Sequence, residues 1–236
     1  MQTGEISELR QADTVFVLSH RLRQPLPAKP KACVILLHGV GSNESNLASL
    51  AAGIDPEVLV VLARGPLQFG PDQYGWFRVV FFAQGPRIDP AEADAARQTL
   101  TRFITQLETA YELQPGNTLV AGFSQGGIMS ASVALSAPES VRGFAILSGR
   151  MLPELEPHIA SRERLAHLRA FIAHGEFDSK LPVSWAERSE KWLGDLDVAY
   201  ETHRYPVDHT LSVEMRQDFL AWVGQVFNAV GSGLPR

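Results

Sequence analysis

The stretch Thr118-Leu119-Val120-Ala121-Gly122-Phe123-Ser124-Gln125-Gly126-Gly127 decides the fold of this 236-residue chain. Residues 118–121 form a short apolar run that is typical of a buried strand. Residues 122–126 match Gly-x-Ser-x-Gly, in which a sharp strand-to-helix turn lifts the serine hydroxyl clear of the backbone. Small and apolar residues follow at 127–135 and predict a buried helix. The pattern therefore has the strand and the helix that such a turn requires, and it predicts Ser124 as a nucleophile rather than an incidental serine in a glycine-rich turn.

Short apolar runs alternate with segments of helical periodicity along the rest of the chain. This alternation predicts an α/β fold with a mostly parallel central sheet and helices on both faces. The expected strands are residues 14–18, 33–37, 58–62, 118–121, 143–147, 170–173 and 198–203. Those between 118 and 173 are unbroken apolar runs, as strands buried on both faces should be. With no repeat or linker, residues 1–236 are expected to form a single domain, with flexible ends at 1–10 and 230–236.

Two helices have clear sequence boundaries. Asp89 can cap a helix that has Pro90 in its first turn and carries an apolar stripe before it ends ahead of Pro115. That stripe consists of Leu100, Phe103, Ile104, Leu107 and Tyr111. A last helix, with Thr210 as its expected cap, should bury Met215, Phe219, Trp222, Val223 and Val226.

Composition excludes several function classes. The net charge is −5, from 21 basic and 26 acidic residues, and no Lys/Arg cluster forms the positive stripe that nucleic acid requires. Neither a secretory signal nor an apolar run of about 18 residues is present, so we expect a cytoplasmic protein without an integral membrane segment. Cys33 is the only cysteine and lies in an expected strand, which leaves no disulfide and no cysteine-rich metal site. We expect neither metal nor cofactor.

A nucleophilic serine needs a base and an acid that orients the base. In enzymes built on this turn they follow in the order Ser, Asp or Glu, His, on loops after later strands. Asp178 lies in such a loop after the strand at 170–173 and is the expected acid. Glu176 and Asp195 are the alternatives, although Glu176 is close to the strand end and Asp195 lies in an expected helix-to-strand turn.

The expected base is His209, in the loop between the last strand and the last helix. His203 lies inside a strand pattern, whereas His158 and His167 fall on a polar segment, so these three are expected to be structural or solvated. His174 is expected to form hydrogen bonds near the Asp178 loop rather than to act as the base.

The oxyanion formed by serine attack must be stabilised by backbone N–H groups. One normally belongs to the residue after the nucleophile, here Gln125, and the other to an earlier loop. His38-Gly39-Val40-Gly41-Ser42-Asn43 follows the strand at 33–37, and the N–H of Val40 is the candidate. Gly39-Val40-Gly41 also resembles half of a dinucleotide fingerprint, but the third glycine is missing and residue 44 is Glu.

Together these residues resemble the phospholipase/carboxylesterase family of small α/β hydrolases, which includes acyl-protein thioesterases and bacterial carboxylesterases. The resemblance spans nearly the whole chain. Its motifs are Leu37-His38-Gly39-Val40-Gly41, Gly122-Phe123-Ser124-Gln125-Gly126-Gly127, Ser148-Gly149, His174-Gly175-Glu176-Phe177-Asp178 with Leu181-Pro182, and Tyr74-Gly75-Trp76-Phe77. Val207-Asp208 departs from the glycine often found ahead of the family's histidine, and Ser42-Asn43-Glu44 matches the family's oxyanion loop only loosely.

The resemblance implies the α/β-hydrolase fold and cofactor-free hydrolysis of carboxylic esters by Ser124, Asp178 and His209. We expect small to medium-chain esters to react through an acyl-enzyme, with Leu67, Trp76, Phe77 and Met151 contacting the substrate. An acyl thioesterase, a lysophospholipase and a peptidase are alternatives with the same triad. A non-catalytic binding protein with this fold is a further alternative, against which the complete triad argues. The sequence leaves open whether the protein forms a homodimer.

Overall fold

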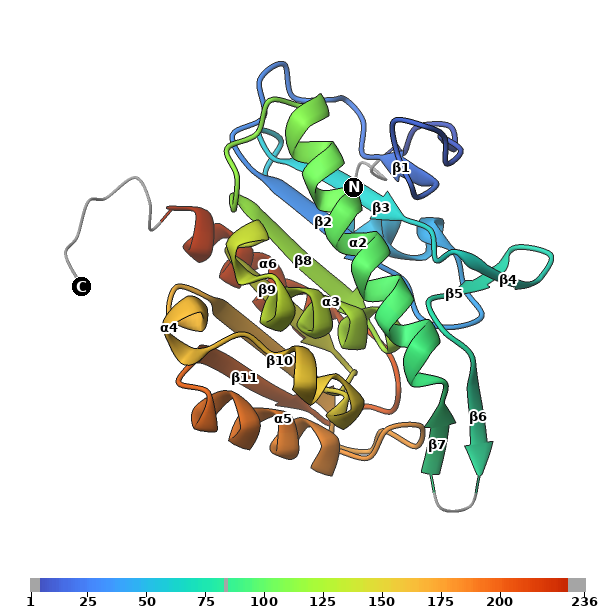
Figure 1. The fold of residues 1–236 in the computed structure, drawn as a ribbon, viewed down its shortest axis with the longest axis vertical. Helices are drawn as coiled ribbons and strands as arrows, with labels where there is room; N and C mark the ends of the chain where they lie inside the picture. Colours follow the sequence, from blue (N-terminus) through green and yellow to red (C-terminus); the bar gives the residue numbers. More distant parts are fainter. Residues whose placement is uncertain (1–4, 83–84, 229–236) are drawn as a thin grey trace.

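A seven-stranded sheet in the order β1-β3-β2-β8-β9-β10-β11 organises the computed structural model, which describes residues 5–82 and 85–228 (Figure 1). All neighbours pair in parallel except β1, which pairs antiparallel with β3 at one edge. The strands are β1 (His20–Leu22), β2 (Cys33–Leu37), β3 (Leu59–Ala63), β8 (Thr118–Phe123), β9 (Gly143–Leu147), β10 (Arg169–Gly175) and β11 (Ala199–Tyr205). This is the mostly parallel sheet that the sequence predicts.

Side chains alternate between the two faces of the sheet and build a core on each face. On one face they pack with α2 (Pro90–Ala110), α3 (Gln125–Ser136) and α5 (Ser184–Asp195), which lie in front of the sheet in Figure 1. On the other face they pack with α1 (Ala48–Ala51) and α6 (Val213–Asn228). The fully buried strands β2, β3 and β9 read as continuous apolar runs because both of their faces are covered.

The remaining elements are short. Two small hairpins, β4 (Leu67–Gly70) with β5 (Gln73–Gly75) and β6 (Val79–Phe82) with β7 (Gly85–Ile88), join β3 to α2 and extend from one side of the molecule (Figure 1). The helical turns η1 (Glu44–Leu47), η2 (Pro138–Ser140), η3 (Pro153–His158) and α4 (Arg162–Leu165) connect larger elements. Within the described ranges, no helix has the length and apolarity required to cross a membrane.

The strand predicted at residues 14–18 is wrong. Phe16 and Leu18 are buried, but the backbone here forms a turn in which Asp13 accepts the N–H groups of Val15 and Phe16. The N–H of Val17 is donated to the Gln106 side chain rather than to a strand. The apolar pattern therefore reflects packing against α2, and the first strand of the sheet begins at His20.

The predicted helix ends are partly confirmed. Asp89 caps α2 by accepting the N–H of Ala91, with Pro90 as the first helical residue. The predicted cap of α6 is wrong, because the helix begins at Val213 and Ser212 accepts the N–H of Met215. At the N-terminus, residues 5–10 form backbone hydrogen bonds with residues 20–24. The expected flexibility of residues 1–4 and 230–236 lies outside the described residues.

The burial of Phe16 predicts a large loss of stability on truncation. Its ring is fully buried and packs edge-on against Phe103. We expect Phe16→Ala to lower the free energy of unfolding by about 3–5 kcal/mol, as for other buried aromatic truncations. Val15, which is 50% exposed, provides the control, and Val15→Ala should change stability by less than about 0.5 kcal/mol. Equal effects of the two variants in urea unfolding would contradict this packing.

Candidate active site

Ser124 lies in a strained turn between β8 and α3. Its backbone adopts φ 55° and ψ −115°, in a region that non-glycine residues rarely occupy. Its N–H is donated to the carbonyl of Leu147 at the end of the neighbouring strand β9. The turn thus holds the serine at the carboxyl edge of the sheet, where open α/β sheets bind ligands.

Close contact between α3 and the sheet explains the glycines of the motif. A Cβ at Gly126 would lie 1.9 Å from the carbonyl oxygen of Leu37, and one at Gly122 would lie 2.2 Å from the carbonyl carbon of Gly126. Real side chains do not tolerate such distances. Glycine is therefore a steric requirement at both positions.

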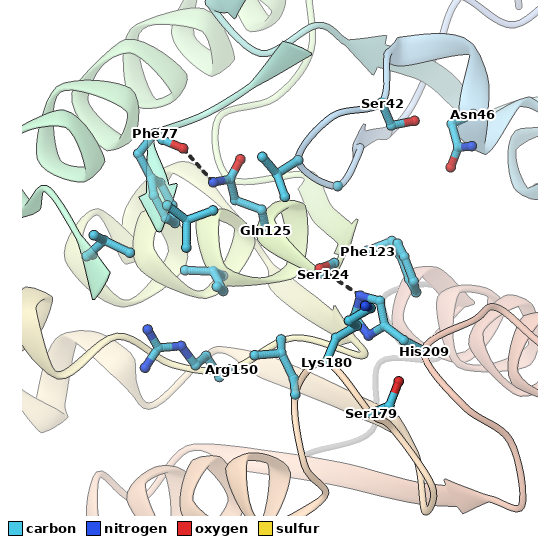
Figure 2. Close-up of a pocket in the computed structure, with 16 residues that line it drawn as sticks. Ser42, Asn46, Phe77, Phe123, Ser124, Gln125, Arg150, Ser179, Lys180 and His209 are labelled. Atoms are coloured by element: carbon cyan, nitrogen blue, oxygen red, sulfur yellow. Dashed lines mark hydrogen bonds between the residues drawn. The ribbon is translucent and has the colours of Figure 1, made fainter. Parts of the chain in front are cut away.

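A chain of hydrogen bonds joins Ser124, His209 and Asp178. The His209 Nε2 atom lies 2.9 Å from Ser124 Oγ, and the His209 Nδ1 atom lies 2.7 Å from Asp178 Oδ2. Because the carboxylate accepts the Nδ1–H, Nε2 is left as the acceptor for the serine hydroxyl. Figure 2 shows the His209 ring directed at Ser124 in the wall of the cavity that both residues line. The structure thus brings together the three residues that the sequence singled out.

Asp178 is held as a buried carboxylate. Its Oδ1 atom accepts the backbone N–H groups of Leu181 and Lys180, at 2.7 and 2.9 Å. Burial acts to raise the pKa of Asp178, but the hydrogen bonds from His209 and Leu181 outweigh this effect and keep the pKa below its ordinary value. His174 donates to the carbonyl of Leu181 and so supports the loop, as expected.

The alternative acids lie elsewhere. Glu176 is exposed, and its backbone N–H is bound to the Tyr205 carbonyl. Asp195 ends α5 and forms an ion pair with Lys191. Among the residues that the structure describes, Asp178 is the carboxylate bonded to the His209 ring.

Asp208 links the loops that carry the acid and the base. Its Oδ1 atom accepts the backbone N–H groups of Ser179 and His209, both at 2.7 Å. These hydrogen bonds, with that from Ser179 the largest contribution, lower the pKa of Asp208. The residue that departs from the family pattern ahead of the histidine is therefore an anchor for the loop. Sequence reasoning missed this role because Ser179 is distant in the chain.

The loop after β2 passes beside the nucleophile. Gly39 and Val40 line the same cavity as Ser124, and a Cβ on Gly39 would be 3.3 Å from the Cβ of Ser124. Buried His38 donates its Nδ1–H to the Gly39 carbonyl and accepts the Gly65 N–H at Nε2. Burial lowers the pKa of His38, which agrees with this neutral ring.

The expected oxyanion donors are near Ser124 and available. Gln125 is the first residue of α3, so its N–H has no partner within the helix. For Val40, no acceptor of its N–H is found within residues 5–82 and 85–228. Both residues line the cavity.

The Gln125 side chain has a separate role that sequence reasoning missed. Its Oε1 atom accepts the N–H of Trp76 at 2.8 Å. Its Nε2 atom donates to the carbonyl of Phe77 at 2.7 Å (Figure 2). These bonds hold the aromatic segment against the serine turn. The Trp76 ring in turn donates its Nε1–H to the His38 carbonyl.

An ion-pair cluster lies next to the loop after β2. Glu44, whose side chain is 1% exposed, binds Arg21 of β1 and Arg64 after β3 at 2.8 and 2.6 Å. Burial would raise the pKa of Glu44, but the hydrogen bonds from Arg64 and Arg21 lower it to about 2. Arg64 also lies over the ring of Tyr74, whose backbone pairs with Gly41 and Ser42.

The cavity at Ser124 has a volume of about 700 Å³. Phe77 lines it, with Val79, Ile88, Ile128 and Leu181 as further apolar lining. The other three expected substrate contacts are not among its lining residues. Leu67 pairs with Gly75 in the β4–β5 hairpin. Trp76 is buried, with its ring bonded to His38 in the loop after β2. Met151 points to a separate depression beside Trp192, whereas the preceding residue, Arg150, lines the cavity.

No group of three His, Cys, Asp or Glu side chains in the described part of the chain is arranged to hold a metal ion.

The sheet order, the serine turn and the loop positions are those of an α/β hydrolase. The sequence model of the phospholipase/carboxylesterase family matches residues 24–225. The chain belongs to this family of esterase and thioesterase-type hydrolases.

Individual proteins are similar to this chain over most of their length. Acyl-protein thioesterase 1 of Emericella nidulans is 26% identical over 231 residues, which cover 89% of this chain and 96% of that protein. Acyl-protein thioesterase 1 of Mycosarcoma maydis is 28% identical over 85% of this chain and 93% of that protein. The Bacillus cereus carboxylesterase structure superimposes with a TM-score of 0.79 at 22% identity, covering 92% of this chain and 97% of that chain.

The Glu44 cluster predicts a pH-dependent contribution to stability. Glu44→Gln leaves two arginines without their buried partner and should lower the free energy of unfolding at pH 7 by about 3–5 kcal/mol. The folded pKa lies below the ordinary 4.5, so this stabilisation is present above pH 4.5 and is lost as the pH falls toward about 2. Denaturant unfolding of the unmodified protein and of Glu44→Gln should therefore show a difference in the free energy of unfolding that becomes smaller below pH 4.5.

Glu57 provides the control for this measurement. It forms a 3.7 Å ion pair with Lys31 in which both side chains are more than two-thirds exposed. Glu57→Gln should change stability little at any pH. A Glu44→Gln effect that is equally large at pH 7 and at pH 3 would contradict the electrostatic origin.

Proposed function

We propose that this protein is a serine carboxylesterase that hydrolyses small to medium-chain carboxylic esters through an acyl-enzyme. The observation that carries the proposal is the continuous hydrogen-bond chain from Ser124 through His209 to Asp178. Ser124 and His209 also line the cavity of about 700 Å³. Membership in the phospholipase/carboxylesterase family supports it. A cytoplasmic location and a homodimer stay predictions.

In the first half of the reaction, Ser124 Oγ attacks the ester carbonyl carbon while His209 Nε2 takes the hydroxyl proton. Asp178 holds the ring in the required tautomer and stabilises the imidazolium. The carbonyl oxygen becomes an oxyanion that accepts the N–H groups of Val40 and Gln125. When the tetrahedral intermediate collapses, the bond to the alcohol oxygen breaks and His209 gives that oxygen the proton.

In the second half, water attacks the carbonyl carbon of the acyl-Ser124 ester. His209 removes a proton from the water, and the oxyanion again lies against Val40 and Gln125. Collapse releases the carboxylic acid, and His209 returns the proton to Ser124 Oγ. No cofactor takes part in these steps.

A thioesterase is the second candidate, because the curated relatives of Emericella nidulans and Mycosarcoma maydis are named acyl-protein thioesterase 1. The same residues would perform the reaction, with a thiol in place of the alcohol. Matched O-acyl and S-acyl substrates that share one acyl chain separate the two candidates through their kcat/KM values. A kcat/KM at least tenfold higher for the thioester, after correction for its uncatalysed reactivity, would favour the thioesterase.

The triad is tested by substitution and by covalent labelling. A fluorophosphonate probe should label Ser124, and Ser124→Ala should abolish both labelling and ester hydrolysis. His209→Ala and Asp178→Asn should each reduce kcat by about 10³-fold or more, because the base is lost or wrongly oriented. Exposed Glu176 is the matched control, and Glu176→Gln should leave kcat within about twofold. Retained hydrolysis in Ser124→Ala would refute the proposal and would favour another site.

The apolar lining predicts how activity depends on the length of a neutral acyl chain. Each methylene buried against Phe77, Ile128 and their neighbours contributes about 0.8 kcal/mol, or roughly fourfold in kcat/KM. We expect 4-nitrophenyl esters to improve from acetyl to about hexanoyl or octanoyl and then to level off or decline. Only the short helical turns η3 and α4 lie between β9 and β10, so no rate increase is expected above the micelle concentration. Acetate as the best substrate, or activity confined to a lipid interface, would contradict this interpretation.

A further inference from the structure

Arg150 is a buried cation in the cavity wall without a charged partner. The residue is 5% exposed, yet it has no hydrogen bond or ion pair with any described residue, and its Nε atom is fully buried without an acceptor. A guanidinium offers five donors, and buried charges are normally paired because desolvation is costly. An unpaired guanidinium in the wall of the cavity that contains Ser124 therefore points to a ligand as its partner.

The protein holds this cation in place without neutralising it. The guanidinium lies over the ring of Trp185, 4.4 Å from its centroid, and Arg188 lies over the same ring at 4.7 Å. Burial lowers the pKa of Arg150, although arginine still remains charged. Glu154, whose charge opposes this shift, is exposed and forms no ion pair with Arg150 among the described contacts.

The lining of the cavity favours an anion. Arg150 and Lys180 are among its lining residues, and no Asp or Glu of the described chain is. Lys180 is exposed, so Arg150 supplies the buried charge. One guanidinium is neutralised by one carboxylate, to which it can donate two parallel hydrogen bonds.

The position of Arg150 assigns the anion to the acyl part of the substrate. His209 must protonate the leaving alcohol, so the alcohol lies on the His209 side of Ser124. In Figure 2 Arg150 lies to the left of Ser124 and His209 to its right. Apolar Ile128 and Leu181 also line this cavity, and they suit the methylene groups of an acyl chain.

We propose that Arg150 binds a carboxylate at the far end of the acyl chain, so that the preferred substrates are half-esters or half-thioesters of dicarboxylic acids. This inference rests on the proposed function. It defines the substrate class by charge, in addition to chain length.

The test compares an anionic substrate with its neutral counterpart. Mono-4-nitrophenyl adipate carries the terminal carboxylate, and methyl 4-nitrophenyl adipate has the same acyl chain with that carboxylate esterified. Shorter half-esters are avoided, because their own carboxylate attacks the ester and forms a cyclic anhydride. We expect the kcat/KM ratio of anionic to neutral substrate to be about 10 or more in the unmodified protein.

Two arginine variants isolate the interaction. Arg150→Met should reduce this ratio by about 10- to 100-fold, mainly through KM of the anionic substrate. Arg188→Met is the control, because Arg188 lies over the same Trp185 ring but does not line the cavity. This variant should leave the ratio unchanged. Isothermal titration of free adipate into Ser124→Ala protein gives a readout without catalysis, and adding Arg150→Met should weaken this binding by at least about tenfold.

The outcomes separate this inference from the proposed function. A ratio near or below 1 in the unmodified protein, with Ser124-dependent hydrolysis of the neutral ester, overturns the inference and leaves the function standing. If Arg150→Met lowers kcat/KM equally for both substrates and also lowers the melting temperature, Arg150 has a structural role and the inference is overturned. Absence of Ser124-dependent hydrolysis of either ester overturns both proposals.

Discussion

The contact between the start of α3 and the carboxyl ends of β2 and β8 is the constraint on which the site depends. At Gly126 the helix lies so close to the Leu37 carbonyl that no Cβ fits. The chain can reach this position only through a sharp turn, which places Ser124 at positive φ. The same contact brings the β2 loop with Gly39 beside Ser124 and leaves the N–H of Gln125 at the free end of a helix. This one close contact between α3 and the sheet thus positions the serine and both expected oxyanion donors.

Sequence patterns predicted the parts of the site that are determined locally. Ser124, Asp178 and His209 each lie in a loop after an apolar strand, and parallel strands bring such loops to one edge of the sheet. The contacts that patterns missed depend on partners far along the chain, as between Gln125 and Trp76. The error at residues 14–18 has a related cause, since an apolar pattern indicates burial but not the hydrogen-bond partners of the backbone.

The electrostatics of the cavity differ from those of the whole chain. The protein carries a net charge of −5, yet the described lining of its cavity contains Arg150 and Lys180 and no carboxylate. The 12-residue helix α3 begins at Gln125, so the positive end of its dipole also lies there. A locally positive cavity on an acidic protein would stabilise the oxyanion that the proposed reaction forms at Ser124, and would favour anionic over cationic ligands, because nearby charges act more strongly than distant, screened ones.

Several unfavourable features of the structure lie at the carboxyl edge of the sheet. The positive φ values of Ser124 and Ser148 occur in residues that are not exposed, whereas Asp72, Glu112 and Asp197 have positive φ in exposed turns. Ser148 Oγ, Arg150 Nε and His174 Nδ1 are buried here without partners among the described residues, whereas His20 Nε2, Asn117 Oδ1 and Arg216 Nε are such atoms in other parts of the fold. Strained backbone of this kind costs of order 1–3 kcal/mol per residue and persists only where the surrounding structure enforces it. The two cores that cover the sheet provide that support where β8 and β9 end at the cavity.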